Sequence, residues 1–274
     1  MEIGLPIKDL EKYNNYMGKS IEDKLFFVPH LPQKDLNFVD FGCADGRLLG
    51  HLYSLYEYSD FSHQYIGYDC SEAMIDLAKS TFTGEYLTKF TTSWNEVMNS
   101  KLPGRDNVLI LSSVIHEVYS YAKSEKDIFD FWTKVTQSGF DYIVIRDMIP
   151  ASDLSRPTNP KLLKKFREKV YDKDLESMVS DFENRYGSIE DNKNFTHFLL
   201  KYRWRVNWKR ELGENYFPIT VEDLINSMTS YKTYNLDYME RFRVPYLDEC
   251  IKRDFGIELN DYTHTKAIFS KSKE

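Results

Sequence analysis

Residues 37–47, NFVDFGCADGR, form an apolar run, an acid and a turn that contains two glycines. A helical pattern follows, and a second apolar run ends in Asp69, 23 residues after Gly46. An α/β sheet binds an adenosine with this order of strand, glycine turn, helix, strand and acid. The small residues admit the ligand, and the acid accepts hydrogen bonds from the ribose hydroxyls. We therefore predict an adenosine site at this turn.

The pattern that binds nicotinamide dinucleotides is G-x-G-x-x-G. In this chain the same frame is Gly42, Ala44 and Arg47, so its third glycine is missing. An NAD-dependent dehydrogenase is therefore the weaker alternative.

The turn resembles motif I of the class I S-adenosylmethionine-dependent methyltransferases, an acid followed by G-x-G-x-G. Asp40, Gly42 and Gly46 match that motif, and Ala44 stands where the middle glycine is usual. The resemblance covers about residues 38–148 and continues more loosely to the C-terminus. It implies S-adenosyl-L-methionine as the cofactor and methyl transfer as the reaction. It also implies that Asp40 orients the methionyl end above the turn and that Asp69 binds the ribose.

The spacing of apolar runs predicts an α/β fold with a doubly wound, mostly parallel sheet and helices on both faces. Ser71, Ser124 and Thr220 are expected to cap helices, the second through a capping box. The resemblance implies seven strands with a reversed last strand. The strands are expected at 37–42, 64–69, 86–92, 107–112, 141–146, 232–238 and 264–270, and the helices at 46–58, 71–81, 124–139, 220–228 and 245–254.

The rhythm of strands and helices changes after Pro150. Residues 151–215 are rich in charge and helix formers, which predicts a helical insertion that caps the substrate. Four regions are expected: a helical lead-in or lid with a helix over 7–26, the Rossmann-like cofactor core, the insertion and the end of the core sheet. Their bounds are 1–36, 37–150, 151–215 and 216–274.

Composition limits the class of protein. The chain has 274 residues, a formal net charge of −7 and three dispersed cysteines. So few cysteines disfavour a disulfide framework or a zinc site and predict a cytoplasmic protein. No apolar run approaches the roughly 20 residues that span a bilayer, and the N-terminus lacks a signal-peptide pattern. No membrane partner is expected, and the sequence does not indicate an oligomeric state.

The resemblance assigns further residues to the cofactor. Some belong to the turn, some follow the ribose acid, and some end the third and fourth strands. Ser93 and Trp94 replace an acid that many members place beside the adenine amine, and a plain core role for Trp94 is an equal alternative. The assignments beyond Asp40, Gly42, Ala44, Gly46 and Asp69 are Cys43, Cys70, Met74, Ser93, Trp94, Ser112 and Ser113.

Residues 111–119, LSSVIHEVY, resemble the motif that follows the fourth strand in many small-molecule and RNA methyltransferases. Parallel sheets bind ligands at the carboxyl ends of their strands. His116 is the leading catalytic candidate, because an imidazole beside a carboxylate accepts a proton near neutral pH. Glu117 adjoins it, and Asp147 is the second base candidate. The alternatives are a histidine bonded to a loop carbonyl and a solvated turn at Arg146 and Asp147.

No metal site is expected at His116 and Glu117. Adjacent residues on a helix point apart, and the sequence shows no other ligand cluster.

Two stretches of the insertion are rich in cations. Residues 161–170 and 201–210 each carry five Lys or Arg, and the second interleaves them with aromatic rings. Such a surface neutralises phosphates and stacks bases. The alternative is an amphipathic helix whose Trp204 and Trp208, one turn apart, face the core.

The methyl acceptor is therefore expected to be an oxygen or nitrogen atom of a small metabolite, a nucleotide or RNA. A non-catalytic S-adenosylmethionine-binding module, acting as a sensor or partner subunit, is the other alternative.

Overall fold

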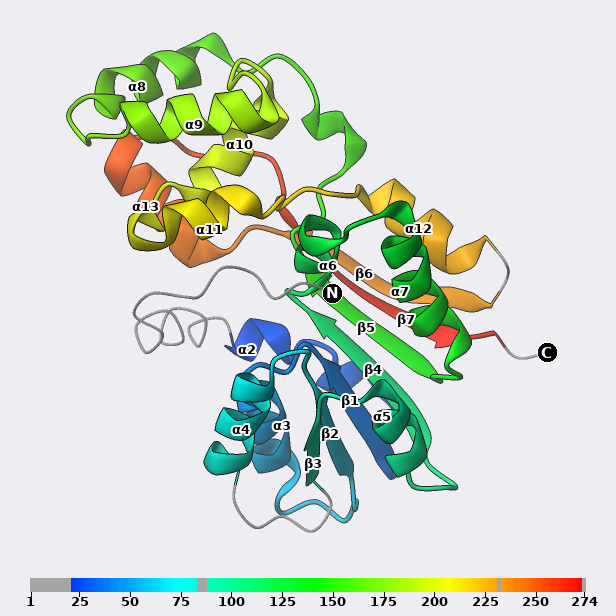
Figure 1. The fold of residues 1–274 in the computed structure, drawn as a ribbon. Coiled ribbons are helices and arrows are strands. Elements are labelled where there is room, and N and C mark those ends of the chain that lie inside the picture. Colours follow the sequence, from blue (N-terminus) through cyan, green and yellow to red (C-terminus); the bar gives the residue numbers. More distant parts are fainter. Residues whose placement is uncertain (1–20, 83–87, 231–232, 273–274) are drawn as a thin grey trace.

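A seven-stranded sheet forms the centre of the computed structural model, which describes residues 21–82, 88–230 and 233–272 (Figure 1). The strand order is β3-β2-β1-β4-β5-β7-β6. The first five strands pair in parallel, and β7 runs antiparallel to both of its neighbours. The predicted mostly parallel sheet with a reversed last strand is confirmed. The strands are β1 (Leu36–Phe41), β2 (Gln64–Tyr68), β3 (Thr88–Thr91), β4 (Asp106–Ser112), β5 (Tyr142–Asp147), β6 (Tyr234–Phe242) and β7 (His264–Lys271).

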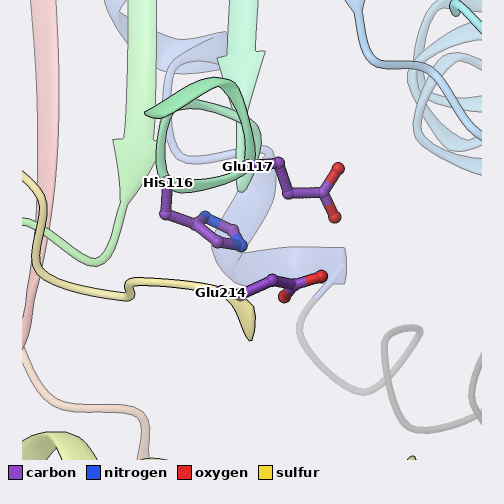
Figure 2. Close-up of side chains that lie close together, drawn as sticks. All are labelled: His116, Glu117 and Glu214. Carbon is purple, nitrogen blue, oxygen red and sulfur yellow. The ribbon is translucent and has the colours of Figure 1, made fainter. Parts of the chain in front are cut away.

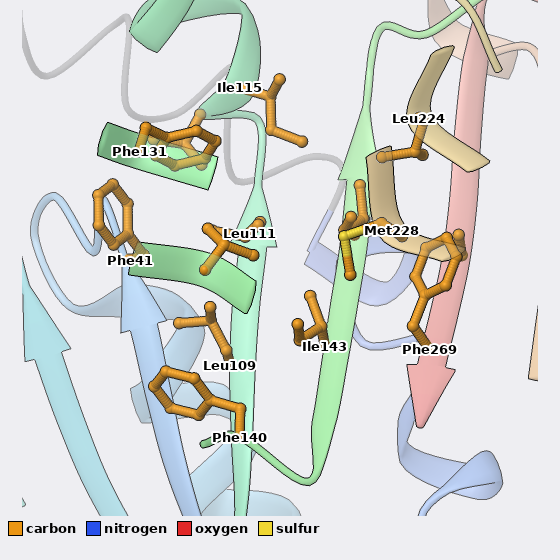
Figure 3. Close-up of a cluster of buried hydrophobic side chains, with 14 of the residues drawn as sticks. Phe41, Leu109, Leu111, Ile115, Phe131, Phe140, Ile143, Leu224, Met228 and Phe269 are labelled. Atoms are coloured by element: carbon orange, nitrogen blue, oxygen red, sulfur yellow. The ribbon is translucent and has the colours of Figure 1, made fainter. Parts of the chain in front are cut away.

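Helices cover both faces of the sheet, and each face has its own apolar core. Every residue of β1 is buried, as expected for a central strand packed on both sides. Val39 and Leu109 face one core, shown in Figure 3, and Phe38 and Val108 face the other. The helices around the sheet are α2 (Ile21–Lys24), α3 (Arg47–Tyr56), α4 (Glu72–Thr81), α5 (Trp94–Ser100), α6 (Ile115–Tyr121), α7 (Glu125–Gln137) and α12 (Val221–Thr229).

Local capping fixes where several helices begin. The Ser71 hydroxyl accepts a hydrogen bond from the Met74 amide at the start of α4. Capping boxes begin α7 at Ser124 and α12 at Thr220. These N-caps confirm the three predicted helix starts, because each satisfies amides that the helix leaves unpaired.

A second group of helices lies together at one end of the sheet (Figure 1) and is called the cap below. Its apolar cluster includes Phe166, Phe182 and Phe198 and also Phe255. The cap consists of α8 (Pro160–Val170), α9 (Glu176–Tyr186), α10 (Asn192–Lys201), α11 (Trp208–Gly213) and α13 (Pro245–Phe255). Helix α13 thus joins the cap from the predicted end of the core sheet, and the exact domain boundaries stay a prediction.

One alternative from the sequence is wrong. An amphipathic helix does not span 201–210, because α10 ends at Lys201 and a short 3-10 helix, η3 (Arg205–Asn207), precedes α11. Trp204 therefore lies outside both helices. Most of the expected lead-in helix, residues 7–20, lies outside the described residues. Among the residues that are described, no helix is both long and apolar enough to cross a membrane.

Candidate cofactor and catalytic site

The glycine turn joins β1 to α3 at the carboxyl edge of the sheet. Gly42, Ala44 and Gly46 have left-handed φ angles of 80°, 46° and 75°. A Cβ atom on Gly42 would lie 2.8 Å from Val114 Cγ2, so both backbone and space favour glycine. Ala44 adopts its angle with an exposed methyl group. The turn keeps the backbone accessible at the position where the sequence predicts a ligand.

Asp69 lies against this turn, directly after β2. Its Oδ2 accepts a hydrogen bond from the Ala44 amide at 3.0 Å, and its Oδ1 accepts one from the Ser71 amide at 2.9 Å. Burial raises the pKa of Asp69, and these amides oppose that rise. Each carboxylate oxygen accepts more than one hydrogen bond, and Asp69 is only half-buried. Its geometry therefore suits two ribose hydroxyls.

Asp40 lies at the end of β1, and its carboxyl group is buried. Burial raises the pKa of Asp40 to about 7, against the opposing effect of Lys24. Burial also lowers the pKa of Lys24 to about 8, and Arg146 adds to that shift. A buried acid therefore lies beside the turn, and a positive charge that binds nearby would stabilise its ionised form.

Two serines, Ser112 and Ser113, lie at the end of β4, at the same edge of the sheet as the glycine turn. Ser113 has a left-handed φ of 59°, and its hydroxyl accepts a hydrogen bond from Arg146 Nη1 at 3.0 Å. The buried Ser112 hydroxyl has no hydrogen-bond partner among the residues that the structure describes. A buried hydroxyl of this kind is expected to find a partner, so Ser112 fits a ligand contact.

The residues proposed to edge the adenine differ in their surroundings. Cys70 is exposed and Met74 is half-buried beside Asp69. The Cys43 side chain is buried, so only its backbone is available to a ligand. The Ser93 hydroxyl caps α5 by accepting a hydrogen bond from the Glu96 amide at 3.3 Å.

Trp94 packs with the core. Its ring lies edge-on to Phe41 and Tyr68, at centroid distances of 5.5 and 5.4 Å. Lys134 lies over the same ring at 5.4 Å. We therefore give Trp94 a packing role and leave it out of the proposed cofactor site.

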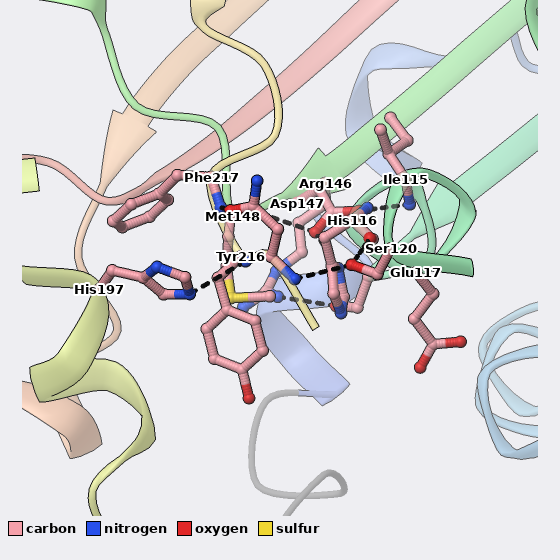
Figure 4. A network of polar contacts seen from close by, with 12 residues as sticks. Ile115, His116, Glu117, Ser120, Arg146, Asp147, Met148, His197, Tyr216 and Phe217 are labelled. Atoms are coloured by element: carbon pink, nitrogen blue, oxygen red, sulfur yellow. Dashed lines mark hydrogen bonds and ion pairs between the residues drawn. The ribbon is translucent and has the colours of Figure 1, made fainter. Parts of the chain in front are cut away.

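His116 and Asp147 form a buried pair at the carboxyl ends of β4 and β5 (Figure 4). His116 Nδ1 lies 2.7 Å from Asp147 Oδ1. Asp147 Oδ2 accepts a hydrogen bond from the Ile115 amide at 2.7 Å, and Oδ1 accepts another from the Met148 amide at 2.8 Å. The two alternatives, a loop-bonded histidine and a solvated turn, do not describe this geometry.

Burial and charge set the protonation of this pair. Burial alone would lower the pKa of His116, but the Asp147 carboxylate raises it to about 9. Burial would raise the pKa of Asp147, yet His116 and the surrounding amides hold it below its ordinary value. At neutral pH the pair is an imidazolium–carboxylate ion pair. His116 therefore already carries the proton that the sequence expected it to accept.

The cap brings a second pair of charged residues to His116. Glu214 Oε1 accepts hydrogen bonds from Tyr121 at 2.8 Å and lies 2.8 Å from Arg210 Nη2. The same nitrogen of Arg210 lies 3.1 Å from Glu117 Oε1. The sequence did not predict the contacts of Glu214 and Arg210 with α6, because nothing in their spacing indicates them; Arg210 was expected only as one cation of the 201–210 stretch.

His116, Glu117 and Glu214 face one another in Figure 2, and one ligand atom from each lies within 4.8 Å of the others. Glu214 is a third possible ligand that the sequence did not show, because the segment after α11 returns to α6; the expected absence of a metal stays a prediction. Burial and the nearby Glu214 raise the pKa of Glu117 to about 7, against the effects of His116 and Arg210.

Two cations of the 201–210 stretch, Lys201 and Arg210, do not form an open basic surface. Lys201 is fully buried, and its ammonium donates hydrogen bonds to the carbonyls of Glu211 and Glu214. Arg210 is paired with carboxylates. On α8, Arg167 pairs with Glu190 at 3.0 Å on the surface. These contacts remove Lys201 and Arg210 from any cationic face of the second stretch, whereas the Lys and Arg residues of 161–169 are exposed.

No protein-family model matches the chain, and no curated protein sequence is similar to it. Solved structures are similar in fold. The pyocyanin biosynthetic protein PhzM has a TM-score of 0.50 at 11% identity, over 96% of this chain and 59% of PhzM. The plantazolicin methyltransferase BamL has a TM-score of 0.48 at 13% identity, over 96% of this chain and 88% of BamL.

An S-adenosylmethionine-dependent methyltransferase from Mesorhizobium loti has a TM-score of 0.47 at 15% identity, over 89% of this chain and 95% of that protein. The chain spans about half of some other similar structures, such as 47% of a pericyclic reaction enzyme. The strand order, the reversed β7 and the likeness to PhzM confirm the predicted α/β fold with a mostly parallel sheet.

Proposed function

We propose that this chain is an S-adenosylmethionine-dependent methyltransferase that acts by in-line displacement on an oxygen or nitrogen atom. The observation that carries the proposal is the Asp69 carboxylate, held against a left-handed glycine turn by the Ala44 amide. Asp40 and Ser112 support it, because a buried acid and a buried hydroxyl border the same turn and strand edge. NAD fits less well, since Arg47 replaces the third glycine.

When bound, S-adenosylmethionine supplies a methyl group on a positively charged sulfur. The chain's own task is to align two reactants and exclude water, and alignment alone contributes roughly 7–11 kcal/mol in well-oriented reactions. Asp69 and Asp40 would hold the two ends of the cofactor. Glu117 would take the proton of the acceptor, because part of its side chain is exposed and burial together with Glu214 raises its pKa above the ordinary value. An acid with a pKa near the working pH is the most effective proton acceptor.

His116 and Asp147 would orient this proton acceptor. Asp147 binds the His116 ring and the first amides of α6, so the helix that carries Glu117 is fixed from β5. The imidazolium also provides a fixed positive charge beside Glu117, which limits the repulsion between Glu117 and Glu214.

Asp69→Ala tests the cofactor site. We expect S-adenosylhomocysteine to bind more weakly by about 1.5–3 kcal/mol, as expected when hydrogen bonds to a charged group are lost. Calorimetry measures this directly, and Asp76→Ala on the exposed face of α4 is the matched control. An unchanged dissociation constant would remove the ribose role. Stabilisation of the wild type by NAD alone would reject the methyltransferase proposal.

His116→Ala tests catalysis. We expect S-adenosylhomocysteine formation from S-adenosylmethionine, with a metabolite extract as the acceptor source, to slow by about 100-fold, because loss of the ring misplaces Glu117. The dissociation constant of S-adenosylhomocysteine should change little, because His116 lies on the acceptor side. Equal rates in mutant and wild type would return His116 to a structural role. Cofactor binding without turnover would favour the sensor or partner-subunit alternative.

A further inference from the structure

We infer that the acceptor presents a basic nitrogen, a protonated amine or a guanidinium, to Glu117 and Glu214. This inference rests on the proposed function and names the substrate class of the same site. It concerns the three side chains in Figure 2, which come from α6 and from the segment after α11.

The geometry of these side chains calls for a positively charged donor. Glu117, Glu214 and His116 place one ligand atom each within 4.8 Å of one another. Carboxylates only accept hydrogen bonds when ionised, and the Nδ1 atom of His116 is already occupied by Asp147. The two glutamates thus converge as hydrogen-bond acceptors, and a cation that donates hydrogen bonds to them is stabilised by their charge.

The cluster lies where a methyl acceptor would have to bind, at the edge of the sheet that holds the proposed cofactor residues. Helix α6 begins three residues after β4 ends, at the edge where the cofactor residues lie. The Asp69 carboxylate is close enough to Glu117 to raise its pKa. Glu214 approaches from the cap, and its side chain is only 2% exposed. A group bound between the two glutamates therefore lies at the carboxyl edge of the sheet, against the cap.

Arg210 bridges the two carboxylates through one oxygen of each, and each carboxylate has a second oxygen that can bind a ligand. Its Nη2 atom contacts the Oε1 atom of both glutamates, and each carboxylate accepts through two oxygens. Glu117, Glu214 and Asp147 carry three formal negative charges, against two positive charges on Arg210 and His116. A cationic ligand removes this excess and favours the ionised form of Glu117.

An anionic acceptor fits poorly. A phosphate at this place would face Glu117 and Glu214. The nearby cations already have partners, since Lys201 is buried against backbone carbonyls, Arg210 is paired with both glutamates and His116 is paired with Asp147. The cluster therefore disfavours a nucleotide or RNA phosphate as the group that is recognised next to the methyl donor.

The chemistry balances with these residues. The bound ammonium loses one proton to the Glu117 carboxylate and becomes a neutral amine. A nitrogen–carbon bond then forms as the sulfur–carbon bond breaks, and the electron pair of that bond stays on sulfur. The product nitrogen carries the positive charge that the sulfur has lost, so Glu214 faces a cation before deprotonation and again after the transfer.

Histidine-labelled protein saturated with S-adenosylhomocysteine provides the test. Millimolar methylamine and methylguanidinium are expected to shift the His116 ring signals in a saturable way, and methyl phosphate is expected not to. Glu117→Gln and Glu214→Gln should each weaken this binding by about tenfold, as expected for the loss of a charged hydrogen bond. Glu125→Gln, on the exposed start of α7, is the matched control.

The outcomes separate the two proposals. Failure of S-adenosylhomocysteine to bind would reject the proposed function, whereas its binding with no response to either cation would overturn only the basic-nitrogen inference. A saturable response to methyl phosphate would overturn it as well. So would tight binding of Mn²⁺ or Zn²⁺ that is lost in Glu214→Gln, because the cluster would then be a metal site. If Glu214→Gln does not fold, the half-exposed Glu117→Gln carries the comparison.

Discussion

Asp147→Asn is expected to lower the free energy of unfolding by about 3–5 kcal/mol, the usual cost of removing one partner of a buried ion pair. Asp147 receives hydrogen bonds from four donors: the His116 ring and the amides of Ile115, His116 and Met148. Asparagine replaces one accepting oxygen with an amino group that faces these donors. The variant therefore loses the charge and leaves buried donors without an acceptor.

Urea unfolding measures this loss, and its pH dependence identifies the cause. The pKa of His116 is raised to about 9, so its stabilising effect is complete below its ordinary value of 6.5 and disappears as the pH rises through 9. The pKa of Asp147 is lowered, so its effect is complete above 3.8 and disappears as the pH falls. The difference between wild type and variant should therefore be largest between these two ordinary values.

Asp130→Asn is the matched control, because Asp130 pairs with Lys126 one turn away on the exposed face of α7. Its loss should cost at most about 0.5 kcal/mol. A comparable loss in both variants, or a difference for Asp147 that does not depend on pH, would show that charge pairing with His116 does not stabilise the fold.

Local chemistry explains why much of the fold could be predicted. Ser71, Ser124 and Thr220 cap helices through atoms within three residues of themselves, so the sequence alone contains the whole interaction. The glycine turn is equally local, since its left-handed angles depend on residue type. The reversed β7 was predicted through the resemblance, because no local pattern specifies strand direction.

The rest depends on contacts between distant segments. Lys201 belongs to a stretch of cations that is typical of a solvated surface. In the structure its side chain is buried, because the carbonyls of Glu211 and Glu214 accept hydrogen bonds from its ammonium. Glu214 reaches α6 only because the cap folds back over the sheet edge. The protonation of His116 follows from burial and from Asp147 on another strand. Each of these contacts joins different segments of the chain, so the residue pattern of one segment does not predict it.

Asp40→Asn is expected to stabilise the protein above pH 7 while it weakens cofactor binding. Burial raises the pKa of Asp40 from 3.8 to about 7. Between these values the unfolded chain loses a proton that the folded chain keeps, so wild-type stability falls as the pH rises. Asparagine stays neutral and avoids this loss, a gain of about 2–4 kcal/mol at 1.36 kcal/mol per pKa unit.

The stability difference should vanish below pH 4, where both states of the wild type hold the proton. Asp60→Asn, at an exposed site, is the control and should stay within about 0.5 kcal/mol of the wild type at every pH. Calorimetry at pH 8 measures S-adenosylhomocysteine binding. We expect Asp40→Asn to weaken it by about 1.5–3 kcal/mol, the contribution of a carboxylate that holds the methionyl end. A variant that is more stable and binds S-adenosylhomocysteine as tightly as the wild type would show that Asp40 is a buried acid without a role in the site. A variant that gains no stability would show that Lys24 keeps Asp40 ionised in the folded protein.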